Sequence, residues 1–233
     1  MRAWASTISL VALAAAGAIG LSACREPKMS LANGPRAYTP EDYPDVLKRW
    51  TRTQQLLLFA QLDDKLTATA TYESWDFRWA YVVRYADDYR LTVEQRRVLL
   101  DKSLAEVKNN HRFYVALYGS APRRSLDLSK GESAWVVRLV DDRGNETAPS
   151  QIEAVRKPGP LEWTYFPYTT SFRYVFRITF PVAMDGKPSV SENASWLGLR
   201  FAGPEGNEEL RWLLRDGAAN RVALEGVETR IAQ

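Results

Sequence analysis

The sequence predicts an α+β fold that is mainly β, namely an immunoglobulin-like antiparallel β-sandwich with an inserted helical hairpin. Several short segments alternate apolar and polar residues with a period of two, and turn signals rich in Gly, Pro, Asp and Asn separate them. Residues 75–109 instead repeat their apolar residues with helical spacing. Of the 233 residues, 45% are hydrophobic, which is enough for an apolar core that must form without an intrachain disulfide, since the chain has one cysteine.

Residues 1–23 have the layout of an export signal, with a basic residue ahead of an apolar run. The run closes with the motif Leu21-Ser22-Ala23-Cys24. This motif resembles the lipobox of bacterial lipoproteins, and the resemblance covers the first 24 residues alone. It implies that residues 1–23 are a signal peptide that is removed, and that Cys24 then carries acyl chains on its thiol and amino group.

Two other interpretations of this segment stay open. A transmembrane helix needs about 20 predominantly apolar residues, whereas this run is shorter and charged residues follow it at once. A plain cleaved signal with an unrelated cysteine also fits the small residues before the cleavage point. The position of the single cysteine favours lipidation. Arg25 stands where Asp would favour retention in the inner membrane, so the resemblance implies the outer membrane.

Residues 24–42 are predicted to be the lipidated cysteine and a flexible tether, because they are rich in Pro and lack apolar periodicity. Such a tether reaches about 20 to 40 Å. Thr39 and Pro40 are typical of a helix start, but Pro44 is expected to end that helix after a turn. The globular domain is therefore predicted to span residues 43–233.

Residues 48–72 are predicted to form a β-hairpin that turns at Asp63-Asp64-Lys65, since residues 66–72 alternate Thr with small apolar residues. A helix over residues 46–62 is the alternative, because the Leu-rich run there has no clear period.

The helical hairpin is predicted over residues 75–109. Ser74 is the expected N-cap of the first helix, whose aromatic residues recur every four positions. Because this helix is apolar over most of its surface, it should be buried on more than one side. Thr92 and Gln95 form a capping box at the start of the second helix, which is expected to end at Asn109-Asn110.

Further strands are predicted over residues 112–118, 135–140, 172–180, 196–202 and 209–214, and residues 221–231 are a weak strand or a tail. The last two strands should pair across the turn at residues 203–207. Residues 172–180 give the clearest pattern, with aromatic and aliphatic residues at the even positions and Arg173 and Arg177 on the opposite face.

Several function classes are excluded by residue content. The 31 basic and 28 acidic residues are spread along the chain, so no nucleic-acid partner is predicted. The only histidine, His111, belongs to no zinc or triad motif, and no phosphate-binding glycine loop occurs, so no metal or cofactor is predicted. Three aspartate pairs, Asp63-Asp64, Asp87-Asp88 and Asp141-Asp142, lie at predicted turns or helix ends, where Asp is favoured for backbone hydrogen bonds.

Two surfaces are candidate binding sites. The aromatic segment over residues 163–168 could stack on sugar rings, although packing in the core is the competing use. The second is an anionic-ligand patch made of Arg138, Arg173, Arg177 and Arg200, provided that their strands pair nearby. A guanidinium suits lipid phosphates, but a merely solvated sheet face is the alternative.

The sequence therefore predicts a lipid-anchored protein of the cell envelope, and more specifically a non-enzymatic binding or structural module. Its expected partners are the membrane through Cys24, and an envelope protein, a glycan or an anionic lipid. An envelope glycan hydrolase is the alternative, and it requires two carboxylates about 5 to 9.5 Å apart in a cleft.

Overall fold

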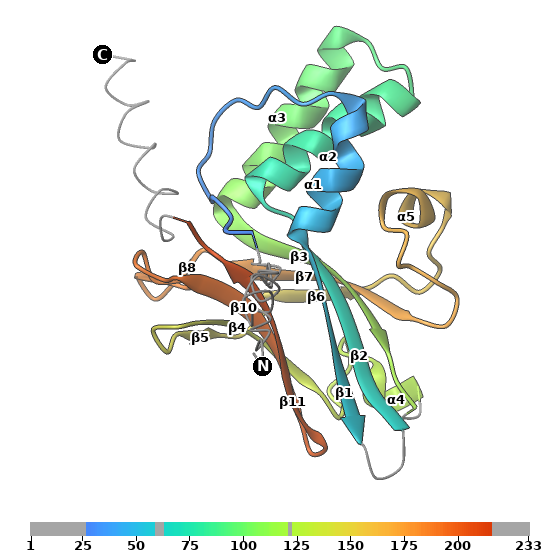
Figure 1. The fold of residues 1–233 in the computed structure, drawn as a ribbon, viewed down its shortest axis with the longest axis vertical. Coiled ribbons are helices and arrows are strands. Elements are labelled where there is room, and N and C mark those ends of the chain that lie inside the picture. The colour runs from blue at the N-terminus through green and yellow to red at the C-terminus, as the bar shows by residue number, and fades with distance from the viewer. Residues whose placement is uncertain (1–26, 59–62, 121–122, 216–233) are drawn as a thin grey trace, which may run out of the picture.

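The computed structural model of the protein describes residues 27–58, 63–120 and 123–215 (Figure 1). One antiparallel sheet has the strand order β1 (Thr51–Leu58), β2 (Asp63–Tyr72), β3 (Asn110–Tyr118), β7 (Tyr174–Pro181), β6 (Gln151–Ala154). The second has the order β11 (Gly206–Leu213), β10 (Trp196–Gly203), β4 (Val136–Asp141), β5 (Glu146–Thr147), and a short hairpin pairs β8 (Ala183–Met184) with β9 (Lys187–Pro188). The predicted α+β, mainly β class is confirmed, whereas its immunoglobulin-like character stays a prediction.

The two sheets pack through a buried aromatic cluster. The ring of Trp212 on β11 lies 5.4 Å from that of Phe113 on β3, and its Nε1 donates to the backbone oxygen of Trp50 at 2.8 Å. The other face of the five-stranded sheet is also covered, because Tyr114 stacks on Phe166 with 3.8 Å between ring centroids. Residues 113–117 are accordingly all buried. Strand β3 thus forms the centre of a layered core.

The predicted helical hairpin is present, and it lies at one end of the molecule (Figure 1). It consists of α2 (Trp75–Asp88) and α3 (Val93–Asn109). The side chain of Ser74 accepts a hydrogen bond from the amide of Phe77, and Thr92 and Gln95 form the capping box. Both predicted helix starts are therefore confirmed.

The segment between the tether and the first strand differs from the prediction. A short 3-10 turn, η1 (Pro40–Asp42), leads into α1 (Tyr43–Trp50), and Pro44 lies in the first turn of that helix. Proline is tolerated there because the first amides of a helix have no intrahelical partner. The expectation that Pro44 ends the helix was wrong. The alternative helix to residue 62 was also wrong, since β1 begins at Thr51.

The predicted antiparallel pairing of β1 with β2 is confirmed, but the predicted turn at Asp63-Asp64-Lys65 was wrong, because these residues belong to β2. Asp63 pairs with Leu58 and Asp64 with Leu57, so both aspartates belong to β2 rather than to the turn. The predicted weak strand or tail over residues 221–231 lies outside the described residues.

Residues 27–42 are not a free tether. Met29 and Leu31 are buried, and Met29 forms a parallel bridge with Leu214 just beyond β11. The Met29 amide donates to the oxygen of Leu213 at 2.7 Å, and the Arg215 amide donates to the oxygen of Met29 at 2.7 Å. The described part of the domain therefore begins at about residue 27 rather than at Tyr43. We call residues 27–42 the N-terminal strap.

Candidate functional site

The structure does not gather the four arginines of the predicted patch. Arg177 belongs to β7 of the five-stranded sheet and Arg173 directly precedes that strand, whereas Arg138 and Arg200 face each other on β4 and β10 of the second sheet. Each pair projects from the face of its sheet that points away from the aromatic cluster between the sheets. The anionic-ligand patch, as predicted, is therefore split into two pairs on the two outer faces of the sandwich.

Carboxylates neutralise most of these arginines. Arg200 donates to Glu209 at 2.7 Å and lies 3.1 Å from Glu146, which also lies 3.9 Å from Arg138. Arg177 forms an ion pair of 2.9 Å with Glu162. These pairs leave little unpaired positive charge, which favours the alternative of a solvated, charge-balanced sheet face.

Arg173 differs from the other three because its hydrogen-bond partner is neutral. Its Nη1 donates to Oγ1 of Thr69 at 2.8 Å, on the neighbouring strand β2. This hydrogen bond orients the guanidinium without neutralising it, so Arg173 retains its charge at the start of β7.

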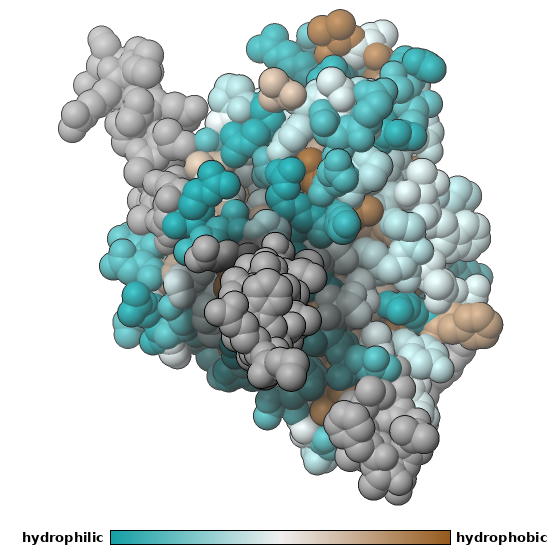
Figure 2. All heavy atoms as spheres, viewed as in Figure 1, coloured by the Kyte–Doolittle hydropathy of each residue, from teal (hydrophilic) through white to brown (hydrophobic). Residues whose placement is uncertain are grey.

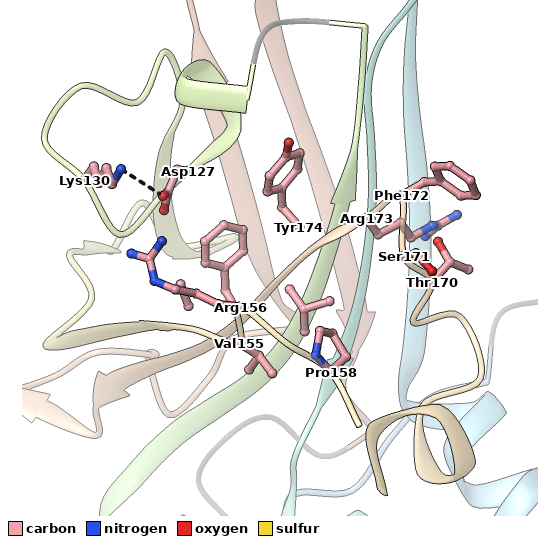
Figure 3. Close-up of a pocket in the computed structure, with 13 residues that line it drawn as sticks. Asp127, Lys130, Val155, Arg156, Pro158, Thr170, Ser171, Phe172, Arg173 and Tyr174 are labelled. Atoms are coloured by element: carbon pink, nitrogen blue, oxygen red, sulfur yellow. Dashed lines mark ion pairs between the residues drawn. The ribbon is translucent and has the colours of Figure 1, made fainter. Parts of the chain in front are cut away.

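A pocket of about 370 Å³ lies where Arg173 enters β7 (Figure 3). Strand β6 pairs with β7 over residues 176–179, and the Val155 amide still donates to the oxygen of Val175 at 2.8 Å, so the pairing ends close to the start of β7. The hollow beside this point is the β6–β7 pocket. Its volume falls within the range of about 300 to 1,000 Å³ that is usual for small-molecule sites.

Three elements supply the lining. Asp127 and Lys130 follow α4 (Arg123–Leu126), residues 154–158 leave β6 towards α5 (Pro160–Tyr165), and residues 170–176 lead into β7. Figure 3 shows Lys130, Asp127 and Arg156 grouped on one side, with Phe172 and Arg173 on the other. The pocket thus joins segments that are distant in the sequence.

The charge of the β6–β7 pocket is positive. Lys130, Arg156 and Arg173 stand against the single carboxylate of Asp127, and the Lys130 ammonium lies 3.8 Å from it. Burial opposes ionisation of Asp127, but hydrogen bonds from the Ser129 side chain and amide outweigh burial and lower the pKa of this carboxyl. Asp127 is therefore an anion at neutral pH and cannot serve as a general acid.

Phe172 gives the pocket an exposed apolar rim, since 81% of the residue is exposed. The sequence pattern predicted that Phe172 faces the core with Tyr174 and Phe176. Phe172 instead precedes β7, so its side chain does not follow the inward and outward alternation of the strand residues. The face of the molecule shown in Figure 2 is mainly hydrophilic, with small apolar patches. An exposed aromatic ring beside guanidinium groups is an arrangement suited to ligand contact.

The aromatic segment over residues 163–168 is used mainly for packing. Tyr165 and Phe166 are buried, and the Tyr168 hydroxyl bonds to Oγ1 of Thr71 at 2.7 Å. Trp163 alone among the large hydrophobic residues of this segment is strongly exposed, at 52%. The segment therefore does not form an aromatic platform for sugar rings.

The remaining candidates from the sequence have structural partners. His111 is buried, and its Nδ1 lies 2.9 Å from the Tyr72 hydroxyl. Asp87 and Asp88 close α2 through ion pairs with Arg90 and Arg84. Across the described part of the chain, no three His, Cys, Asp or Glu side chains gather as a metal site.

Asp141 and Asp142 have a structural role, because their carboxylates accept hydrogen bonds from loop residues. Asp141 accepts hydrogen bonds from the amides of Arg143, Asn145 and Ser191 at 2.7 to 3.0 Å. Asp142 accepts from the amide and hydroxyl of Ser195. Asp141 therefore fixes its own turn, as the sequence indicated, and both aspartates also hold distant loops.

No protein-family model matches the chain, and no curated protein matches it in sequence. A crystal structure of a novel protein of unknown function from Burkholderia pseudomallei aligns with 80% of this chain and 94% of its own, at 13% sequence identity and a TM-score of 0.39. This likeness is too remote to carry an argument about function.

Proposed function

We propose that this protein is a lipid-anchored lipoprotein of the bacterial cell envelope that binds an acidic glycan in the β6–β7 pocket. The lipobox-like motif ending at Cys24 supports the anchor, and its following Arg25 supports the outer membrane. Within the described ranges, no helix has the length and apolar character needed to cross a bilayer. The globular domain acts as a non-enzymatic binding module.

The observation that carries the proposed ligand is the composition of the pocket. Arg156 and Arg173 provide planar donors that match a carboxylate or phosphate group. The hydroxyls of Thr170 and Ser171 are suited to hydrogen bonds with sugar hydroxyls, and the exposed ring of Phe172 offers a flat apolar face. An acidic sugar unit combines all three features, which neither a neutral glycan nor a bare phosphate does.

The alternative of a glycan hydrolase finds less support. The β6–β7 pocket contains one carboxylate, whereas the reaction needs two. A second pocket includes Glu208 and Glu209, but neighbouring strand residues leave opposite faces. Although burial favours the protonated form of Glu209, hydrogen bonds from Arg211 and Arg200 lower its pKa, whereas a general acid needs a raised one.

The anchor is tested by replacing the lipidated residue. We expect Cys24→Ser to remove the acyl mass from the mature protein and to shift the protein from the membrane fraction to the soluble fraction. Mass spectrometry and cell fractionation measure the two effects. Native mature protein without acyl mass at Cys24 would refute the anchor.

The ligand is tested by titrating the mature Cys24→Ser protein with uronic acid oligosaccharides and with neutral glucose oligosaccharides in calorimetry. We expect binding of the acidic series alone. The Arg156→Gln, Phe172→Ala double variant should lose about tenfold or more in affinity, since it removes a charge-assisted contact and a stacking face. A matched control, Arg97→Gln with Val93→Ala, changes the same kinds of exposed side chain on α3. Equal losses in both variants, or no binding of either series, would contradict the proposal.

A further inference from the structure

A second positively charged hollow lies where the N-terminal strap enters the domain. It has a volume of about 260 Å³ and is lined by segments from the strap, α1, α2 and the end of β11. Its charged lining residues are Lys28, Arg36, Arg49, Arg215 and Asp76. We call it the strap pocket. Four cations against one carboxylate give it a formal excess of three positive charges.

Asp76 is the fixed point of the strap pocket. Its carboxylate accepts hydrogen bonds from Arg36 Nε at 2.9 Å, the Tyr38 hydroxyl at 2.7 Å and Trp50 Nε1 at 2.9 Å. The Arg36 guanidinium also donates to the backbone oxygens of Ala32 and Gly34. The donors of Arg36 are therefore used to hold the strap in place.

The other three cations are available to a ligand. Arg49 lies 3.5 Å from Asp76 through one nitrogen, its side chain is 42% exposed, and its remaining N–H groups can donate elsewhere. Lys28 and Arg215 are exposed and form no ion pair within the described residues. Three cationic side chains with open donors thus surround one hollow.

The strap pocket is separated from the proposed anchor by a short length of chain. Pro27, in its lining, is three residues after Cys24, and three extended residues span about 10 Å. From Met29 onward the chain cannot swing away, because its amide and carbonyl are bonded to Leu213 and Arg215. A lipid on Cys24 therefore brings the pocket close to the bilayer surface, at a distance comparable to the Debye length of about 8 Å at physiological ionic strength.

We propose that the strap pocket binds the phosphate of an anionic phospholipid in the membrane that holds the anchor. This inference rests on the proposed lipidation of Cys24. The Arg49 guanidinium and the Lys28 and Arg215 side chains supply donors for a phosphate, and the exposed positions of Lys28 and Arg215 suit contact with a surface. Binding of the headgroup fixes the orientation of the domain, so that the acyl chains and the pocket form two attachments to one membrane.

The test uses the mature Cys24→Ser protein, which has no acyl chain, and measures its co-sedimentation with vesicles. Phosphatidylcholine vesicles containing phosphatidylglycerol should bind it, and pure phosphatidylcholine vesicles should not. We expect binding to weaken as salt is raised. The Lys28→Gln, Arg49→Gln variant should bind about tenfold more weakly or worse, because each basic residue near the surface contributes to the attraction.

Two further variants make the vesicle result specific. Lys28→Gln with Arg215→Gln leaves every contact of Asp76 intact, so its loss of binding cannot reflect misfolding around that residue. Arg97→Gln with Lys102→Gln removes the same charge from exposed positions on α3 and should bind like the parent.

Three results would overturn the inference: no binding of the parent to anionic vesicles, equal losses in the strap-pocket and α3 variants, or competition by free glycerol phosphate at concentrations matching the lipid phosphate. The last result would assign the pocket to a soluble phosphate. Acyl mass on Cys24 is measured separately, so failure of the anchor and failure of the pocket are distinguishable.

Discussion

At the scale of single residues, buried carboxylates hold distant segments of this protein together by accepting hydrogen bonds from several donors. Asp141, at the end of β4, joins the following turn to the loop at Ser191, 50 residues later. Burial opposes ionisation of this carboxyl, but the backbone hydrogen bonds outweigh it and lower its pKa. The charged form is therefore the form that the folded state prefers.

We predict that Asp141→Asn lowers the free energy of unfolding by about 2 kcal/mol at neutral pH, because an amide presents a donor to groups that themselves donate. The folded pKa is lowered, so the stabilisation is present above the unfolded value of about 4 and is lost as pH falls through the folded value. The difference between parent and variant in urea unfolding should thus shrink in acid. An equal difference at neutral and acid pH would contradict this account, and the exposed Asp45→Asn is the control.

At the scale of elements, α2 has two buried sides, as its sequence predicted. Phe77 and Ala80 belong to the main core, whereas Val82, Val83 and Ala86 are buried outside it. Helix α2 is in contact with α3 as well as with α1, so it packs on more than one side. A line of tyrosines continues along the helix from the core to the solvent, ending at Tyr89, which is 52% exposed.

The two ends of this line should respond differently to truncation. Tyr81 packs on the rings of Tyr43, Phe77, Tyr85, Tyr165 and Phe166. We predict that Tyr81→Ala costs about 3 kcal/mol, as expected for a packed aromatic side chain. Tyr89→Ala, the matched control, should cost about 1 kcal/mol or less. Thermal or urea unfolding gives both values. Similar costs at the two positions would contradict the prediction that the tyrosine nearer the core contributes more to stability.

At the scale of the whole molecule, the N-terminal strap joins the four-stranded sheet to the helices. It pairs with the end of β11, packs Met29 and Leu31 into the core, and binds α2 through Asp76. The sequence predicts a tether here because proline-rich segments without periodicity usually make few contacts. The strap is instead packed on the domain, so it holds the domain close to the proposed anchor.

We predict that Leu31→Ala lowers the free energy of unfolding by about 2 to 3 kcal/mol, because it leaves a cavity in the core. Lys28→Ala, an exposed position in the same segment, should change stability by about 0.5 kcal/mol or less. Urea unfolding of the mature Cys24→Ser protein measures both. If residues 27–36 were a free tether, neither substitution would have an effect.

The sequence by itself determined the features that depend on neighbouring residues. Helix starts at Ser74 and Thr92 follow from side chains that reach their own backbone amides, and the turn at Asp141 follows from the same local chemistry. The period of two in β7 and the pairing of β10 with β11 are likewise local signals. These predictions hold because the energies that decide them act within a few residues.

Only the tertiary structure decided the features that depend on which surfaces meet. Arg177 and Arg200 have similar strand contexts, yet they project from the outer faces of different sheets, which splits the predicted patch. The β6–β7 pocket brings together Lys130, Arg156 and Phe172, and no neighbouring sequence pattern indicates that these residues share a site. Strand order and the burial of the strap are set by contacts between residues far apart in the chain. The free energy of such contacts cannot be predicted from any short stretch of sequence.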